Sequence, residues 1–451
     1  MTLRFGTDGV RGHAAELTDE LVTALGRAAA TVLGTDRFLV GRDTRESGPR
    51  LEAALVAGLT AGGAAAEVLG VVPTPTVAWV GAADGVPGAM ISASHNPYGD
   101  NGIKFFAAGG RKLSDAVESR LEQELDRVLS SPAPGARSVA GNHAVDPHAG
   151  RADLERYATA VVDSLDGRRL HGLHVVIDCA NGSAATVAPS VLARLGATVD
   201  VLHAEPDGRN INQNCGSTHP EQLQAAVVAS GAAVGLAFDG DADRVLAVDG
   251  HGALVDGDHL IALCAIDLRD RGELTEDTVV VTVMTNLGFR LAMAERGIQV
   301  IETNVGDRYV LEALAERDLA LGGEQSGHVI FRRMATTGDG LLTGVQLLDL
   351  LVRAGRPLAA LAAEAMTRLP QVLVNVRVPR RDPGLVEAIG REVAAVEAEL
   401  GATGRVLVRP SGTEPLVRVM VEAADEVQAR SMADRLVVAV ERATGAPVAP
   451  Q

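Results

Sequence analysis

Short apolar runs alternate with longer amphipathic segments along the chain, and this alternation predicts an α/β fold. One helix is predicted after Thr18, a favourable N-cap, because apolar residues then recur at helical spacing: Leu21, Val22, Leu25, Ala28 and Val32. A second helix is predicted from Ser47-Gly48-Pro49 to Gly62-Gly63, since Pro suits a first turn and Gly ends one. The run Phe38–Val40 between them predicts a short buried strand.

The same pattern divides the 451 residues into four units. We predict α/β domains over residues 1–150, 151–252 and 253–368, and a smaller α+β domain with two long helices over 369–451. Residues 131–150, rich in Ser, Pro, Gly and His, are predicted to form a linker. Two further helices are predicted at Ala184–Leu195 and Glu221–Ala229. The other predicted strands are Val68–Val72, Ala89–Ile91, His174–Ile177, Thr198–Leu202, Ala233–Phe238, Val279–Val283, Gln299–Ile301, Leu319–Leu321, Val372–Val378, Arg405–Val408 and Leu416–Val421.

Each of the first three units carries a polar loop directly after an apolar strand. These loops read SASHNP (92–97), DGDADR (239–244) and GGEQSGH (322–328). Because α/β proteins place ligands at the carboxyl ends of their strands, we expect the three loops to converge on one cleft.

The loop DGDADR carries three carboxylates at alternate positions, Asp239, Asp241 and Asp243. Carboxylates held this close repel one another unless a cation compensates them, and hard oxygen ligands suit Mg²⁺ or Ca²⁺. An EF-hand is excluded, because Arg244 and Gly250 stand where it needs Gly and Glu. A haloacid-dehalogenase-type phosphatase would need Thr or Val at position 243. A solvated acidic turn is the alternative, and the buried strand before the loop argues against it.

The loop SASHNP offers Ser94 beside His95. His95 is a poor base for a triad with Ser94, since neighbouring side chains diverge in an extended segment. A phosphorylated Ser94 is the more economical hypothesis, because its phosphate could itself bind the metal held by the three Asp. A turn without chemistry is the alternative. Lys104, one of only two lysines, could face this phosphate and donate a proton, although a lone hairpin Lys is more often exposed.

Other loops supply candidate contacts to a sugar phosphate. The third loop carries a carboxylate, a hydroxyl and an imidazole, from Glu324, Ser326 and His328. Such a loop is suited to hydrogen bonding with sugar hydroxyls, and the imidazole is suited to proton transfer. In the last domain two guanidinium groups and two hydroxyls flank a Gly turn, a composition suited to holding phosphate: Arg409, Ser411, Gly412, Thr413 and Arg418. Gly-rich loops carrying Arg11 and Arg308 are weaker signals, and the charged loop Arg42–Arg45 is interpreted as partly structural.

Composition narrows the function classes. A net charge of −17 argues against a nucleic acid or an anionic membrane as partner, and 2% aromatic residues argue against base stacking. No apolar run is long enough to cross a membrane, and the amino terminus has no signal-peptide pattern. The three cysteines are sparse and lack metal-binding spacing, so we expect no structural zinc site and a cytoplasmic location.

A metal site, a phosphoserine and a separate phosphate clamp together suggest phosphoryl transfer on a substrate that carries a second phosphate. ISASHNP, DGDADR and RPSGTEP, in this order along the whole chain, resemble the α-D-phosphohexomutase superfamily. GEQSGH, with TNVGDRYV and NGIKFF, resembles its bacterial glucosamine branch, since the mannose/glucose branch more often reads GEMSGH.

The resemblance implies three similar mixed α/β domains and a C-terminal α+β domain of the TATA-binding-protein-like type around a central cleft. It implies that phosphorylated Ser94 and the three Asp bind one Mg²⁺, and that Glu324 and Ser326 read sugar hydroxyls. Arg409, Ser411, Gly412, Thr413 and Arg418 would hold the non-reacting phosphate. Arg11, Lys104 and His328 would stabilise phosphate and move protons, Arg308 would contact substrate, and His95 and Arg244 would support the loops.

The implied reaction interconverts glucosamine 6-phosphate and glucosamine 1-phosphate through a 1,6-bisphosphate, which also serves as primer. Its product would feed UDP-N-acetylglucosamine and peptidoglycan precursor synthesis. We further predict a homodimer and priming of Ser94 by a kinase or by self-phosphorylation. The alternatives are an enzyme of the mannose/glucose branch, a catalytically silent sugar-phosphate-binding protein, or a Mg²⁺-dependent phosphatase. The missing DxDxT motif and the C-terminal clamp disfavour the phosphatase.

Overall fold

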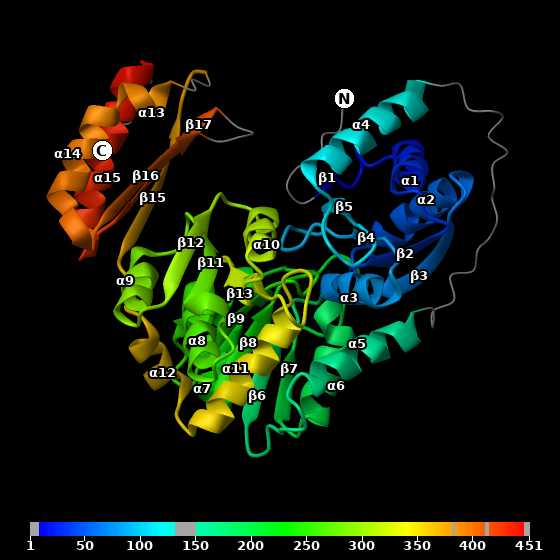
Figure 1. Cartoon of the computed structure of the whole chain (residues 1–451), viewed down its shortest axis with the longest axis horizontal. Helices are drawn as coiled ribbons and strands as arrows, with labels where there is room; N and C mark the ends of the chain where they lie inside the picture. The colour runs from blue at the N-terminus through cyan, green and yellow to red at the C-terminus, as the bar shows by residue number, and fades with distance from the viewer. Residues whose placement is uncertain (1–8, 131–149, 381–383, 411–414, 446–451) are drawn as a thin grey trace. The chain divides into compact units, whose positions relative to one another are not determined.

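The computed structural model describes residues 9–130, 150–380, 384–410 and 415–445 (Figure 1). They form two compact units. The first contains residues up to Met284 together with Ile298–Ala365, and the second contains Thr285–Gly297 and the chain from Met366 onward. No helix among the described residues combines the length and the apolar character needed to cross a membrane. The predicted linker at 131–150 lies, apart from Gly150, outside the described residues.

The first unit contains three sheets that share an order of four strands, to which the first and second sheets add one edge strand each. They run β1-β5-β4-β2-β3, β10-β9-β8-β6-β7 and β14-β13-β11-β12. In each sheet three neighbouring strands are parallel, and the last of the three along the chain continues into an antiparallel hairpin: β4–β5, β8–β9 and β13–β14. This repetition agrees with three similar α/β domains, while the predicted boundaries between them stay a prediction.

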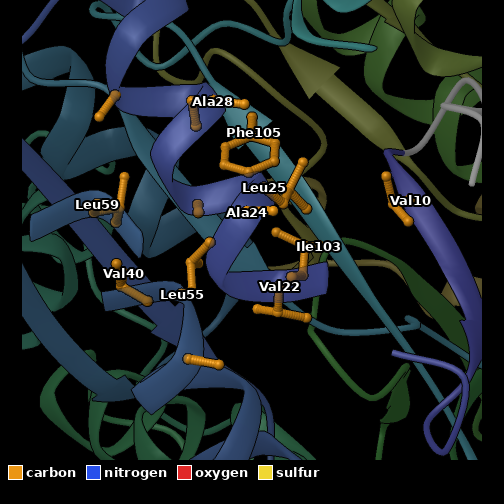
Figure 2. Close-up of a cluster of buried hydrophobic side chains, with 14 of the residues drawn as sticks. Val10, Val22, Ala24, Leu25, Ala28, Val40, Leu55, Leu59, Ile103 and Phe105 are labelled. Carbon is orange, nitrogen blue, oxygen red and sulfur yellow. The ribbon is translucent and has the colours of Figure 1, made fainter. Parts of the chain in front are cut away.

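The first sheet contains β1 (Val10–His13), β2 (Arg37–Arg42), β3 (Ala65–Val71), β4 (Gly88–Ile91) and β5 (Asp100–Phe106). Its helices are α1 (Asp19–Leu33), α2 (Gly48–Ala61), α3 (Thr74–Asp84) and α4 (Asp115–Ser130). Thr18 caps α1 by accepting the Leu21 N–H, as its sequence predicts. The buried faces of α1 and α2 pack on β2 and β5 around Leu25, Leu55 and Phe105 (Figure 2).

The second sheet contains β6 (His174–Asp178), β7 (Thr198–Leu202), β8 (Val234–Phe238), β9 (Val245–Asp249) and β10 (Leu254–Val255). Its helices are α5 (Arg151–Asp163), the short 3₁₀ turns η1 (Ser183–Thr186) and η2 (Gly216–Thr218), α6 (Ala188–Arg194) and α7 (Glu221–Ser230). The helix predicted over Ala184–Leu195 is therefore two pieces. Pro189 lies in the first turn of α6 and has no N–H to continue a helix from η1.

The third sheet contains β11 (Thr278–Thr282), β12 (Gln299–Thr303), β13 (Leu321–Gly323) and β14 (Val329–Phe331). Around it lie α8 (Gly257–Asp270), η3 (Thr275–Asp277), α10 (Asp307–Glu316), α11 (Gly340–Ala354) and α12 (Leu358–Ala365). The strand predicted at Leu319–Leu321 begins two residues later. Pairing of Gly323 with Val329 draws both glycines into β13, which leaves a five-residue loop from Glu324 to His328.

The second unit is a three-stranded antiparallel sheet, β15-β17-β16, covered by helices. Its elements are α9 (Leu287–Glu295), β15 (Gln371–Arg377), α13 (Leu385–Ala388), α14 (Gly390–Leu400), η4 (Gly401–Thr403), β16 (Arg405–Pro410), β17 (Leu416–Glu422) and α15 (Glu426–Thr444). Buried Glu422 ties α9 to this sheet, because its carboxylate accepts the Leu287 N–H and pairs with Arg405. The predicted α+β character and both long helices are confirmed.

Helices α1 and α2 approach each other through glycine. A Cβ built at Gly58 would lie 2.1 Å from the Thr23 carbonyl oxygen, and one at Gly26 would lie 2.5 Å from that of Leu55. Gly58→Ala should therefore force the helices apart and lower the free energy of unfolding by about 1–3 kcal/mol. The urea unfolding midpoint measures this loss.

The matched control is Gly390→Ala in α14, where an added Cβ meets no atom within 4 Å. There the substitution should be neutral or slightly stabilising, because Ala favours a helix over Gly. Equal midpoint shifts in the two variants would contradict the packing argument.

Candidate active site

Three equivalent hairpin loops meet in the first unit, and they are the three loops that the sequence singles out. Ser92–Gly99 joins β4 to β5, Asp239–Arg244 joins β8 to β9, and Glu324–His328 joins β13 to β14. The hydroxyl of Ser94 donates a 2.6 Å hydrogen bond to Asp239 Oδ2. The Val245 N–H donates to the Gly327 carbonyl at 3.1 Å. The predicted meeting of the loops is thus confirmed by direct contacts.

The middle loop buries all three of its carboxylates. Asp239, Asp241 and Asp243 are at most 3% exposed, and one oxygen from each lies within 4.8 Å of the others. Ala242 has φ 57°, a left-handed turn that helps to bring these alternate side chains together. Gly240 leaves no room for a side chain, since a Cβ there would lie 2.6 Å from the Ser94 carbonyl oxygen.

The electrostatics of these carboxylates indicate a site for a cation. Burial, with Asp243 and Asp241 nearby, holds the pKa of Asp239 well above its usual range. Burial also acts to raise the pKa of Asp243, but Lys104, His328 and Arg244 outweigh it and hold that pKa well below its usual range. Within the part of the chain that the structure describes, the buried Oδ1 atoms of Asp241 and Asp243 accept no hydrogen bond. Such oxygens are the hard ligands that Mg²⁺ prefers, so the residues present fit this ion.

Lys104 belongs to this cluster. Its ammonium lies 2.8 Å from Asp241 Oδ2 and 3.1 Å from Asp243 Oδ2, and the residue is 2% exposed. The view of Lys104 as an exposed hairpin residue is therefore wrong. It sits opposite Met90 within β5, a buried strand whose polar residues hide it from a hydropathy pattern.

His328 is fully enclosed between two carboxylates. Its Nδ1 lies 3.7 Å from Asp243 and its Nε2 lies 3.3 Å from Asp307. Burial alone would lower the pKa of His328, but the two carboxylates raise it to about 10. The raised pKa favours the protonated ring, which can stabilise negative charge. The Gly338 N–H donates to Nε2 at 3.0 Å, so Nδ1, on the side of Asp243, is the nitrogen from which the ring can donate a proton.

The backbone at Ser94 is left-handed, with φ 53°. The argument that neighbouring side chains diverge is therefore wrong here, because the segment is not extended. Ser94 Oγ lies 3.5 Å from His95 Nδ1. That nitrogen nevertheless faces the Arg244 guanidinium at 2.8 Å, and burial with Arg244 and Arg11 lowers the pKa of His95 to about 4. His95 and Arg244 therefore link the first loop to the second, and His95 Nδ1 is already occupied.

Two residues that the sequence analysis did not assign to the active site hold the Ser94 loop. Arg45, fully buried and paired with Asp43, donates to the carbonyl oxygens of Ser94, Asn96, Pro97 and Asp100. Asn212 donates to the Ser94 and Asn96 carbonyls from the other side. The only sequence signal for Arg45 was its place in the charged loop Arg42–Arg45 after a buried strand, which we interpret as partly structural. Nothing local marked Asn212.

The residues predicted to contact the sugar phosphate differ in their exposure and in their contacts. Ser326 is exposed, while Glu324 accepts the Gly306 N–H at 3.1 Å and has its pKa raised by burial. Gln325, the residue that distinguishes the two branches in sequence, donates instead to buried Asp258 of α8 at 3.1 Å. Arg308 forms ion pairs with Asp115 and Glu118 of α4, and Arg11 lies on β1 beside β5.

The C-terminal candidates lie in the second unit. Arg409 and Arg418 are directly opposite on β16 and β17, so their side chains share one face of the sheet. Burial, and then Arg418, lowers the pKa of Arg409. An anion between two such guanidinium groups would relieve their repulsion. Ser411, Gly412 and Thr413 lie outside the described residues.

Four family models match the chain in succession. The alpha/beta/alpha domains I, II and III of phosphoglucomutase/phosphomannomutase match residues 2–131, 155–252 and 256–369, and its C-terminal domain matches residues 373–439.

Curated relatives and solved structures agree with these models. A phosphoglucosamine mutase of Rhodococcus opacus is 54% identical over 96% of this chain and 98% of its own. One from Frankia alni is 53% identical over 99% of this chain and 100% of its own. A phosphoglucomutase/phosphomannomutase family structure from Burkholderia thailandensis is similar at TM-score 0.79, with 25% identity, over 100% and 99% of the two chains. Aspergillus fumigatus N-acetylphosphoglucosamine mutase, with GlcNAc-6P and magnesium, shares the fold at TM-score 0.69 and 20% identity over 98% and 96%.

The cation site can be tested through metal affinity. Asp243→Asn removes one negative ligand and should weaken Mn²⁺ binding at least about tenfold, since each 1.4 kcal/mol corresponds to a factor of ten. Electron paramagnetic resonance of free Mn²⁺ measures this at a fixed phosphorylation state of Ser94. The control is Asp249→Asn, a buried position whose backbone donors an amide oxygen can still satisfy. Unchanged affinity in Asp243→Asn would place the cation elsewhere.

Proposed function

The chain belongs to the phosphoglucomutase/phosphomannomutase family and is an enzyme of its phosphoglucosamine mutase group, and from this premise we propose that Ser94 carries the transferred phosphoryl group. The reaction interconverts glucosamine 6-phosphate and glucosamine 1-phosphate through a 1,6-bisphosphate. One observation carries the proposal for Ser94. Its Oγ lies 2.6 Å from a buried carboxylate of a three-Asp cation site.

In the first half-reaction the sugar O1 attacks phosphorus on phosphorylated Ser94. The P–O bond to Ser94 Oγ breaks as the bond to O1 forms. The O1 hydroxyl gives up its proton, and Ser94 Oγ takes one up as it leaves. Bound Mg²⁺, held by Asp239, Asp241, Asp243 and the serine phosphate, would neutralise the developing phosphoryl charge. Lys104 and His328 are the nearby cationic donors, supported by their ion pairs with the same carboxylates. We assign them to charge stabilisation and proton transfer, with Arg11 as a further phosphate contact.

The second half-reaction returns the 6-phosphate to Ser94 after the bisphosphate has turned around. Such a turn requires a holder for whichever phosphate is not reacting. We assign this role to Arg409, Ser411, Gly412, Thr413 and Arg418. The assignment is supported by the position of Arg409 directly opposite Arg418 in the sheet. Glu324 and Ser326 are assigned to the sugar hydroxyls, and Arg308 to substrate contact.

Several finer predictions belong to this proposal. Priming of Ser94 by a kinase or by self-phosphorylation, the homodimer and the cytoplasmic location all stay predictions. The three buried free cysteines, Cys179, Cys215 and Cys264, support a reducing compartment. The relative crystallised with GlcNAc-6P and magnesium supports a sugar phosphate and Mg²⁺ as ligands.

One alternative competes with glucosamine phosphates as the substrate, namely glucose or mannose phosphates. It is favoured by the contact of Gln325 with Asp258, because a side chain turned to the protein does not itself read the sugar. A silent binding protein is disfavoured, since Ser94, the three Asp, Lys104 and His328 are all present and in contact.

A coupled mutase assay tests the substrate and the nucleophile together. With Mg²⁺ and a trace of bisphosphate primer, glucosamine 6-phosphate should be preferred over glucose 6-phosphate and mannose 6-phosphate. Ser94→Ala should abolish turnover, because no phosphoryl carrier remains, while Ser230→Ala at an exposed position of α7 should not change it. Preference for glucose or mannose would retain the mechanism and overturn the substrate assignment. Full activity in Ser94→Ala would overturn the mechanism.

Arg45 tests how much the position of Ser94 matters. Lysine keeps the charge opposite Asp43 but cannot reach four carbonyl oxygens, so Arg45→Lys should let the loop shift. We expect kcat to fall on the order of 100-fold, the effect of misplacing a reacting group by about 1 Å, with KM nearly unchanged. Arg50→Lys, at an arginine of α2 with 40% side-chain exposure, is the matched control and should be neutral. A rise in KM alone would instead indicate a binding role.

A further inference from the structure

A second group of donors lies beside the active site, outside the acidic triad. Asp178 ends β6, His203 follows the neighbouring parallel strand β7, and Cys215 precedes η2. A carboxylate oxygen of Asp178, a ring nitrogen of His203 and the Sγ of Cys215 all lie within 4.8 Å of one another. Asp178 and Cys215 are fully buried, while the His203 side chain is 21% exposed and gives a route from solvent.

The hydrogen bonds around His203 show which ring nitrogen carries the proton and which one points its lone pair at Asp178. The amide nitrogen of Gln222 donates to the Asn214 carbonyl at 3.1 Å, so its Oε1 is the atom 3.2 Å from His203 Nε2. That oxygen can only accept, so Nε2 carries the proton. In the neutral ring, Nδ1 then directs its lone pair at Asp178 Oδ2, only 3.0 Å away.

Two lone pairs at 3.0 Å repel each other unless something positive lies between them. A metal ion bound to both atoms would remove this repulsion, and a His–Asp ion pair is the alternative. The buried thiol of Cys215 on the same side favours the metal, since a simple His–Asp ion pair needs no sulfur. A histidine that binds metal through one ring nitrogen usually donates a hydrogen bond from the other, as His203 Nε2 does to Gln222.

We propose that Asp178, His203 and Cys215 form a second metal site, specific for Zn²⁺ or a similarly thiophilic divalent cation. The ligand set of thiolate, imidazole and carboxylate suits Zn²⁺ and not Mg²⁺, and three protein ligands leave a fourth position for water. Bond lengths of about 2.0–2.3 Å require ligand spacings of up to about 3.8 Å, so a closure of about 1 Å completes the site. Binding breaks the S–H bond of Cys215 and releases its proton to solvent.

The backbone supports the same assignment. His203 has φ 48°, and Ala180 and Asn181, just after Asp178, have φ 55° and 48°. Asn and His enter this region more readily than most residues, whereas Ala does not, so Ala180 is the position whose backbone the surroundings must hold. The Asn181 N–H donates to the His203 carbonyl at 2.6 Å, which joins the two turns.

Metal at this site would stabilise the segments that support Ser94. The Asn212 N–H donates to the Ala180 carbonyl at 2.9 Å, and its side chain donates to the Ser94 and Asn96 carbonyls. Thr44, next to Arg45, donates to the Asn181 carbonyl at 2.6 Å. The site therefore lies one layer of hydrogen bonds behind the Ser94 loop.

The test is a Co²⁺ titration of the full-length, chelator-treated protein under a reducing agent. Wild type should develop a sulfur-to-cobalt charge-transfer band in the near ultraviolet, saturating at one equivalent and displaced by Zn²⁺. The Asp triad also binds Co²⁺, but only through oxygen and without this band. Because the readout uses no turnover, its failure is distinguishable from failure of the proposed mutase function.

Two variants make the assignment specific. Cys215→Ala should abolish the band, whereas Cys179→Ala, a buried cysteine outside the cluster, should keep it. His203→Asn should weaken Co²⁺ binding at least tenfold and remove the rise in thermal midpoint that Zn²⁺ gives wild type. Asn accepts a left-handed backbone, so this variant keeps the fold if Cys215→Ala does not. A wild-type protein without the band, or a band that survives His203→Asn and Cys215→Ala, would overturn the proposal and leave a His–Asp ion pair.

Discussion

Mutual compensation of buried charge is the constraint on which the active site depends. Three carboxylates lie together with at most 3% exposure, an arrangement that is costly unless positive charge surrounds it. Lys104 comes from the first sheet, Arg244 from the second and His328 from the third. Each domain of the first unit thus supplies a cation to one anionic centre, so the same contacts hold the domains together and create the place for a divalent ion.

The repeated sheet order explains how three distant segments reach that centre. In each sheet the functional loop is the turn of the antiparallel hairpin that begins at the last parallel strand along the chain. The three equivalent loops therefore carry different functional groups. The first has a serine, the second has three carboxylates, and the third has a carboxylate and an imidazole. Because the hairpins end in short loops on rigid strands, their side chains are positioned by the sheets and not by the loops alone.

A second layer fixes the reactive serine. Arg45 from the first domain and Asn212 from the second bond the same two carbonyl oxygens, of Ser94 and Asn96. Asn212 is in turn bonded to the strained turn after Asp178, where His203 and Cys215 converge. Phosphoryl transfer depends on alignment, so a layer that immobilises the left-handed backbone of Ser94 contributes as directly as the cations do.

Local sequence determined the α/β class, most strands, the N-cap of α1, the ends of α2 and the identity of the three loops, because periodicity and turn chemistry act over a few residues. It also marked Ser94 and the three Asp, whose spacing already implies a cation. It could not place Lys104, since polar residues in β5 disguise a buried strand, nor Arg45 and Asn212, whose partners are backbone carbonyls 49 and 118 residues away. The cysteine spacing likewise gave no reason to expect a thiophilic metal. Only the tertiary structure brings the three residues together. Asp178 meets His203 because the parallel strands β6 and β7 end side by side, and Cys215 lies beside them because the Gly216 N–H donates to Asp178 Oδ2 at 2.9 Å.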